Sequence, residues 1–176
     1  MKRTVLLLLC IGIMSLSSWS QDAAFSKADK LLNVGIGVNS YYSGGIPIGA
    51  SFEIGINDQF SVGPNIDFLS TKYGGAGSSF KFTALYIGAR ASWHANEALN
   101  ISNPKIDLYL GPTIGYRVFS WKDDYNGSTL KDSYGSGIYI GGFLGGKYYF
   151  NEKLGGFVEL GAIGSTNARL GLAVKF

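Results

Sequence analysis

Residues 106–118 read IDLYLGPTIGYRV, and every second residue of this stretch is apolar, beginning with Ile106. The intervening positions hold Asp107 and Arg117 together with Tyr, Gly and Thr. Alternation with a period of two places the two sets on opposite faces of a β-strand. A strand of about ten residues is also long enough to cross a lipid bilayer when it is tilted. The stretch therefore predicts a long strand with one apolar face.

The same period recurs along most of the chain, from Leu31 to Phe176, in about eight segments. Turn-forming residues separate the segments, for example at Asn57-Asp58, Asn96–Pro104 and Asn151–Lys153. No helical period competes with this alternation. The pattern predicts an all-β fold, an eight-stranded antiparallel up-and-down transmembrane β-barrel.

The predicted connections alternate in length along the chain. Two of them are tight turns, whereas Ser70–Ser79 and Trp121–Ser136 are expected to be longer polar loops. Short periplasmic turns and longer external loops are typical of outer-membrane barrels. An even number of strands then places both termini in the periplasm. The predicted location is the bacterial outer membrane.

The N-terminal 20 residues are predicted to be a signal peptide. Lys2 and Arg3 form a basic start, Val5–Met14 is apolar, and Ser18-Trp19-Ser20 resembles a cleavage site. The apolar run is too short for a convincing transmembrane helix. We expect residues 21–30 to be a short, polar periplasmic lead-in and residues 31–176 to be the barrel domain.

Removal of the signal peptide changes the chemistry of the chain. The single cysteine, Cys10, is lost, and 13 basic residues remain against 12 acidic ones. A chain without cysteine has no disulfide framework, and a nearly neutral chain has no basic face for nucleic acid. We therefore expect an exported protein that does not bind nucleic acid.

One parity of the alternating segments is uncharged and carries aromatic residues near both predicted strand ends. At the short-turn end these are Phe60, Trp93, Tyr148, Phe150 and Phe176, and at the long-loop end Tyr41, Phe68, Tyr116 and Trp121. Two aromatic girdles around an aliphatic band are typical of a surface that faces lipid. This parity is therefore predicted to face the membrane.

The other parity carries the charges and is predicted to line the lumen, the interior of the barrel. The predicted lumen charge network consists of Glu53, Asp67, Arg90, Asp107, Arg117, Lys147, Glu159 and Arg169. Buried charges must be paired, so we expect ion pairs between neighbouring strands. The alternative is a soluble, secreted lipid-binding barrel on which these charges face water and the aliphatic residues lie inside.

Two Gly-Pro pairs interrupt the predicted strands, at Gly63-Pro64 and Gly111-Pro112. Proline removes a hydrogen-bond donor from the ladder, so β-bulges are expected at these positions.

Four features of the chain carry a family resemblance: the signal peptide, the alternation over residues 31–176, the turn Phe150–Leu154 and the C-terminal Leu172–Phe176. Through these features the chain resembles the small outer-membrane β-barrel family of OmpA, OmpX and OmpW. The resemblance implies that Phe176 belongs to a signal read by the barrel-assembly machinery. It implies outer-membrane lipid as a partner and structural, adhesive or passive-transport roles. An extracellular or envelope protein is a further expected partner.

The sequence indicates little chemistry. Ser92, His94 and Glu97 contain the residue types of a lipase, but the strand direction places His94 at the periplasmic end, so we expect an interfacial polar residue and no catalytic site. No metal or cofactor is expected. With eight strands the interior barely holds its own side chains, so we expect function in the external loops or in envelope structure. An alternative is passage of small apolar molecules through a lateral gap at Pro64 or Pro112, as in OmpW-type barrels.

Overall fold

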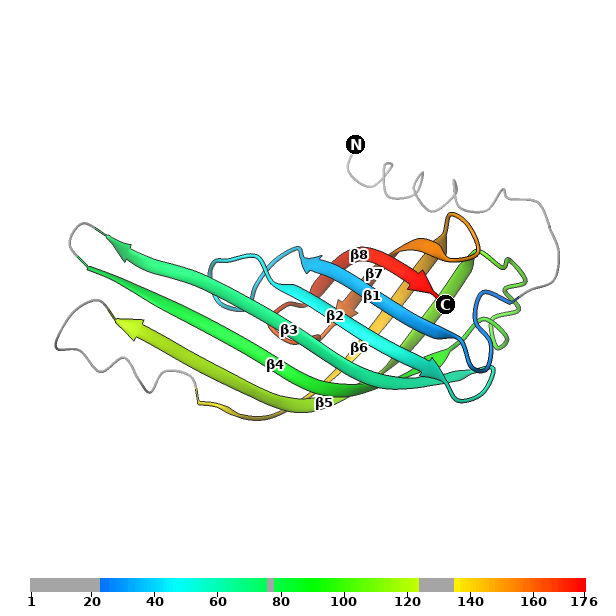
Figure 1. The fold of residues 1–176 in the computed structure, drawn as a ribbon, viewed down its shortest axis with the longest axis horizontal. Helices are drawn as coiled ribbons and strands as arrows, with labels where there is room; N and C mark the ends of the chain where they lie inside the picture. The colour runs from blue at the N-terminus through cyan, green and yellow to red at the C-terminus, as the bar shows by residue number, and fades with distance from the viewer. Residues whose placement is uncertain (1–22, 76–77, 124–134) are drawn as a thin grey trace.

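The computed structural model describes residues 23–75, 78–123 and 135–176, so the predicted signal peptide and residues 124–134 of a predicted loop lie outside it. Eight strands form one closed antiparallel barrel in chain order (Figure 1). They are β1 (Lys30–Gly37), β2 (Ile48–Gly55), β3 (Phe60–Gly75), β4 (Ser78–His94), β5 (Ile106–Asp123), β6 (Gly137–Tyr149), β7 (Leu154–Gly161) and β8 (Ala168–Lys175). The predicted fold is confirmed. None of the described residues forms a helix that is long and apolar enough to span a membrane.

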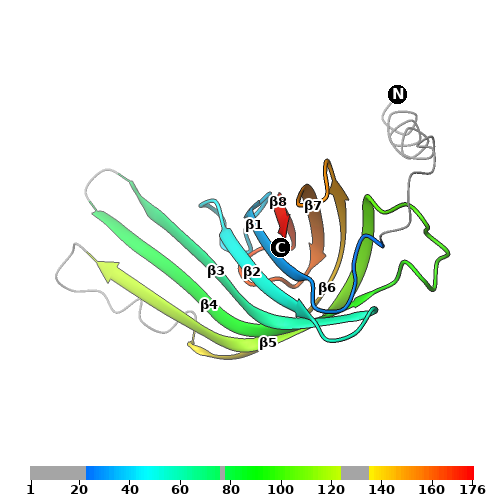
Figure 2. The same cartoon turned by 45° about the vertical axis from the view of Figure 1, so that its right-hand side comes forward.

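The barrel closes between its first and last strands. β8 pairs with β1 from Leu31↔Lys175 to Gly37↔Arg169, and the Phe176 backbone N–H donates to the Lys30 carbonyl at 3.0 Å. Figure 2 shows the strands curving around a common interior, and Figure 1 shows the C-terminus at the end where the β2–β3 and β6–β7 turns lie. Closure leaves no edge strand within the ring, which is what a strand protein in lipid requires.

The two parities of the strands face opposite ways, as the alternation predicts. Aliphatic side chains point outward, and Ile114, Ile140 and Leu172 are 54%, 77% and 56% exposed. Charged side chains point inward, and Asp107 and Glu159 are almost completely buried. This arrangement suits a barrel surrounded by hydrocarbon and is the reverse of a soluble lipid-binding barrel.

β3, β4 and β5 are much longer than the other strands, with 16, 17 and 18 residues against 8 in β1, β2, β7 and β8. The prediction of a loop over Ser70–Ser79 is wrong, because the β3–β4 ladder continues from Ser70↔Thr83 to Gly75↔Ser78. Likewise β5 runs on to Asp123. The three strands extend past the ring as a projection (Figure 1).

The projection keeps the strand period but changes the chemistry of its faces. Lys72, Lys81 and Lys122 are exposed on its outward face, whereas Phe82 is buried on its inner face. The loop prediction fails because exposed polar residues such as Lys72 and Lys81 lie on the outward face of continuing strands. Trp121, predicted to lie in the lipid-facing girdle, instead faces inward and packs against Phe82, with ring centroids 4.5 Å apart.

The two Gly-Pro pairs do not create bulges. Pairing of β2 with β3 is lost opposite Gly63 and Pro64, but it resumes in the same register from Ser51↔Asn65 to Ile54↔Val62. The β4–β5 ladder skips Gly111-Pro112 in the same way. A Cβ on Gly63 would lie 1.8 Å from the Phe52 carbonyl oxygen, so glycine permits close approach where proline gives no donor. At both prolines the pairing is interrupted over two residues, and the register is the same on either side.

Candidate functional site: the lumen and its two ends

Arg90 on β4 forms the centre of the lumen. Its Nε lies 3.1 Å from Glu53 Oε1 on β2, and its Nη2 donates to Glu159 Oε1 on β7 at 2.7 Å. The Tyr109 hydroxyl donates to the same Glu159 oxygen at 3.0 Å, and the Phe143 ring centroid lies 3.6 Å from Arg90 Cζ. These side chains are at most 5% exposed. One guanidinium therefore joins two carboxylates across the barrel.

A second charged group lies nearer the short-turn end. Lys147 Nζ donates to Asp107 Oδ2 at 3.0 Å, and His94 Nδ1 lies 2.7 Å from Asp107 Oδ1. Asp107 and Lys147 are register partners on β5 and β6. This is the expected pairing between neighbouring strands, whereas Arg90 reaches strands that are not adjacent to its own. A narrow eight-stranded barrel allows long side chains to cross it.

A third group lies toward the projection. Arg169 on β8 contacts Asp67 on β3 through Nη2, and it also donates to the Ile163 carbonyl at 3.0 Å. Asp67 additionally accepts the backbone N–H of Ser165 at 2.8 Å. The ion pair therefore holds the 162–167 connection inside the barrel mouth.

Arg117 is separated from the other predicted network residues. It is partly exposed on β5, and its Cζ lies 5.6 Å from the Phe119 ring centroid. Within the described part of the chain, no carboxylate lies within 4.0 Å of it. The structure thus brings together seven of the eight predicted residues, in three groups, and leaves Arg117 outside them.

The segment before β1 packs into the short-turn end of the lumen. Phe25 is buried, and its ring stacks on His94 with centroids 3.5 Å apart and planes 7° apart. The Ala28 N–H donates to the Gly55 carbonyl at 2.9 Å, and Lys175 Nζ donates to the Ala24 carbonyl at 3.3 Å. The lead-in was predicted to be simply polar. Its apolar stretch Ala23-Ala24-Phe25 indicates instead a segment that packs into the lumen, called the plug below.

His94 also corrects the prediction of an interfacial residue, because it is buried in the lumen beneath Phe25. Its Nε2 lies 2.9 Å from Ser61 Oγ, which in turn donates to Glu53 Oε2 at 2.9 Å. The contacts Asp107–His94–Ser61 follow the sequence of contacts in a Ser-His-Asp catalytic triad. However, Ser61 is fully buried and its hydroxyl already donates to Glu53, so these contacts form an internal hydrogen-bond network.

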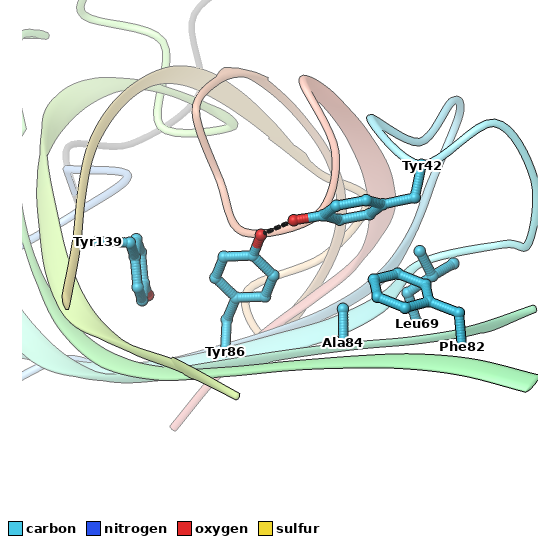
Figure 3. Packing of buried hydrophobic residues seen from close by; sticks show 6 residues of the cluster. All are labelled: Tyr42, Leu69, Phe82, Ala84, Tyr86 and Tyr139. Atoms are coloured by element: carbon cyan, nitrogen blue, oxygen red, sulfur yellow. Dashed lines mark hydrogen bonds between the residues drawn. The ribbon is translucent and has the colours of Figure 1, made fainter. Parts of the chain in front are cut away.

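An aromatic cluster occupies the opposite end of the lumen. It contains Tyr42, Leu69, Phe82, Ala84, Tyr86 and Tyr139, with Tyr73, Phe119 and Trp121 packed against it. Figure 3 shows Tyr42 extending from the β1–β2 connection toward Tyr86, and the two hydroxyl groups form a hydrogen bond. Asn65 Nδ2 donates to the Tyr139 hydroxyl at 3.0 Å. The cluster closes the lumen above the ion pairs.

The described residues do not include three His, Cys, Asp or Glu side chains grouped as a metal site would require. Most of the buried polar groups instead bind one another, although Asn33 Oδ1 and the Tyr149 hydroxyl have no hydrogen-bond partner among the described residues. The lumen is therefore built as a packed polar core.

Several solved structures share this architecture, among them the following three. OprG, an outer membrane protein of Pseudomonas aeruginosa, matches with a TM-score of 0.53 at 11% identity, over 88% of this chain and 99% of that one. Neisserial surface protein A matches with a TM-score of 0.50 at 20% identity, over 84% and 94%. The N-terminal β-barrel domain of P. aeruginosa OprF matches with a TM-score of 0.50 at 15% identity, over 86% and 99%. No protein-family model and no curated protein sequence matches the chain. At these identities the likeness establishes the fold of small eight-stranded transmembrane barrels.

Proposed function

We propose that the chain is a non-conducting outer-membrane barrel with both termini in the periplasm, whose projection of β3, β4 and β5 is the surface that contacts molecules outside the cell. The observation that carries this proposal is the bridge from Arg90 to Glu53 and Glu159, which spans the lumen at its centre. The packed lumen gives the barrel stability, and the projection is then the part available for interaction.

The filled lumen supports the non-conducting part of the proposal. Phe25 covers His94 at one end, and Tyr42 meets Tyr86 at the other. Eight-stranded barrels have interiors just wide enough for side chains, whereas porins with 16–18 strands enclose an aqueous channel. The register is unchanged on either side of Pro64 and Pro112, and no strand shift accompanies the two interruptions of pairing.

The lengths of two connections support the proposed orientation. The β2–β3 and β6–β7 connections, residues 56–59 and 150–153, are short turns at the end that holds both the lead-in and Phe176. The β4–β5 connection, residues 95–105, lies at the same end and is the exception, because it is longer. The projection extends from the opposite end. Short turns in the periplasm and longer elements outside are usual for outer-membrane barrels.

Liposome swelling tests the closed lumen. Purified chain is reconstituted at a known protein-to-lipid ratio and mixed with iso-osmotic arabinose, beside an open 16-stranded porin as a positive control. We expect swelling no faster than in empty liposomes. Swelling that increases with the amount of protein would refute the non-conducting barrel.

Cysteine labelling tests the orientation, since the chain loses its only cysteine with the predicted signal peptide. Lys122→Cys on the projection and Lys153→Cys in a short turn are both exposed positions. We expect a membrane-impermeant maleimide to label Lys122→Cys in intact cells and Lys153→Cys only after lysis. The reverse result would invert the orientation.

A further inference from the structure

The outward face of β3, β4 and β5 is arranged in rows that run across the three strands. Cross-strand register defines three such rows, which change from apolar to hydroxyl to lysine as the strands leave the ring. In that order they are Phe68–Leu85–Val118, Ser70–Thr83–Ser120 and Lys72–Lys81–Lys122. All three lysines are exposed.

The lysine row concentrates like charge. Side chains directly opposite each other in an antiparallel sheet have Cβ atoms about 4.5–5.5 Å apart, and like charges at that spacing are destabilising. None of the ion pairs formed within residues 23–75, 78–123 and 135–176 includes these lysines. An anion lying across the row would relieve the repulsion.

The row lies where a membrane surface would be. Lys81 and Trp93 both face outward on β4 and are separated by twelve residues. With a rise of about 3.3 Å per residue and a strand tilt of about 40°, they are about 30 Å apart along the membrane normal, the thickness of a hydrocarbon core. If Trp93 lies at one interface, Lys81 reaches the headgroups of the other leaflet.

Strand tilt makes the row oblique to the membrane plane. Two strand spacings of about 4.8 Å at a tilt of about 40° separate Lys72 from Lys122 by about 6 Å along the normal. One headgroup layer is about 5–7 Å thick. The three ammonium groups therefore span one headgroup layer.

We propose that the row Lys72–Lys81–Lys122 binds the phosphate groups of lipids in the leaflet around the projection, with the hydroxyls of Ser70, Thr83 and Ser120 donating to the same headgroups. The inference rests on the membrane placement in the proposed function. The order of the rows favours a lipid over a soluble polyanion, because the apolar row directly below matches acyl chains.

The test compares two triple variants of the folded chain without its signal peptide, in a neutral detergent. Lys72→Gln/Lys81→Gln/Lys122→Gln removes the row. Lys27→Gln/Lys105→Gln/Lys153→Gln removes the same charge from exposed lysines at the opposite end. Native mass spectrometry measures binding of bis-phosphorylated lipid A, and faster migration of the unboiled sample on gels verifies that each barrel is folded.

We expect the row variant to bind lipid A roughly 10- to 100-fold more weakly at low salt, since basic side chains near an anionic surface act cumulatively and are screened by salt. The control variant should bind within about twofold of the wild type. Dephosphorylated lipid A should bind equally weakly to all three.

Three results would overturn the proposal while leaving the membrane barrel intact. The first is equal binding by the row variant and the wild type. The second is equal loss in both triple variants. The third is binding of inositol hexaphosphate to the row as tightly as lipid A, which would make the row a soluble-polyanion site. If the wild-type protein, after reconstitution into bilayers, does not migrate faster on a gel when it is left unboiled, the proposed function fails. This inference then fails with it.

Discussion

The inner face of the barrel has two regions of opposite chemistry. Where all eight strands enclose it, the inner face carries Glu53, Arg90, Asp107 and Glu159. Where β3, β4 and β5 continue alone as the projection, the same face carries the aromatic cluster around Phe82. The strand period is the same in both regions, so the difference lies in what surrounds the side chains.

In the enclosed region inward side chains of one strand face those of the strands across the lumen. A charged side chain such as Arg90 therefore lies within hydrogen-bonding distance of carboxylates on strands that are not its neighbours. Outward polar residues would meet hydrocarbon there, so polarity is confined to the inside. In the projection the sheet has one concave face and no facing strands, and the β1–β2 connection packs on it through Tyr42. Apolar packing within that face is then the available source of order, while lysines point outward.

Removal of the central cation should have the largest effect on stability. Arg90→Met leaves Glu53 and Glu159 buried without their shared partner, which we expect to cost about 3–5 kcal/mol of unfolding free energy. Arg117→Met is the matched control on the same face, and we expect a cost of about 1 kcal/mol or less. Urea unfolding in lipid vesicles, followed by gel mobility, measures both.

A triple variant sharpens this prediction. Arg90→Met combined with Glu53→Gln and Glu159→Gln removes the uncompensated charges, so most of the stability should return. If Arg90→Met alone is as stable as the wild type, the bridge does not hold the enclosed region together, and the contrast with the projection loses its energetic basis.

Disruption of the aromatic cluster should act locally. Phe82→Ala removes a fully buried ring that packs on Trp121 and Tyr42, and we expect a cost of about 2–4 kcal/mol confined to the projection. In a Trp93→Phe background the emission of Trp121 should shift to longer wavelength, while unboiled gel mobility stays unchanged. Global unfolding by Phe82→Ala would show that the two regions form one cooperative unit.

The sequence predicts the enclosed region well because the physics there is local. A period of two determines which residues face lipid, and the placement of Ile114 outward and Asp107 inward follows from parity alone. Parity also places Trp121 inward with Arg117, which agrees with its contact with the aromatic cluster. The limits of β3 and β4 were missed because Lys72 and Lys81 resemble loop residues until their membrane depth is known.

The pairings across the lumen were beyond the sequence. Which carboxylates Arg90 reaches depends on barrel shear and diameter, which no single strand encodes. Tyr42, Ser165 and Phe25 enter the lumen from connections and from the lead-in, where backbone turns set direction. Ser61 was missed as a partner of His94 because the two lie 33 residues apart and meet only through the β3–β4 register.

The plug should be weaker than either region of the inner face. Phe25→Ala removes the ring stacked on His94, and because the segment is terminal we expect a local cost of about 1–2 kcal/mol. Hydrogen exchange of the Ala28 amide, which donates to the Gly55 carbonyl, should accelerate by about tenfold. Leu144 amide exchange in β6 is the internal control. Equal acceleration at both amides would mean that the plug supports the whole barrel.

The smallest effect on equilibrium stability is expected at Phe176, which is 65% exposed. Phe176→Ala should change the unfolding free energy by less than about 1 kcal/mol, because little surface is buried there. If the terminal ring is read by the assembly machinery, the variant should refold normally in pure lipid yet accumulate less in the outer membrane of cells. Phe150→Ala, an exposed aromatic at the same end, is the control and should change neither quantity. Equal losses in cells for both variants would make Phe176 an ordinary interfacial anchor. Slow refolding of Phe176→Ala alone in pure lipid would place its role in barrel closure beside Lys30, without any machinery.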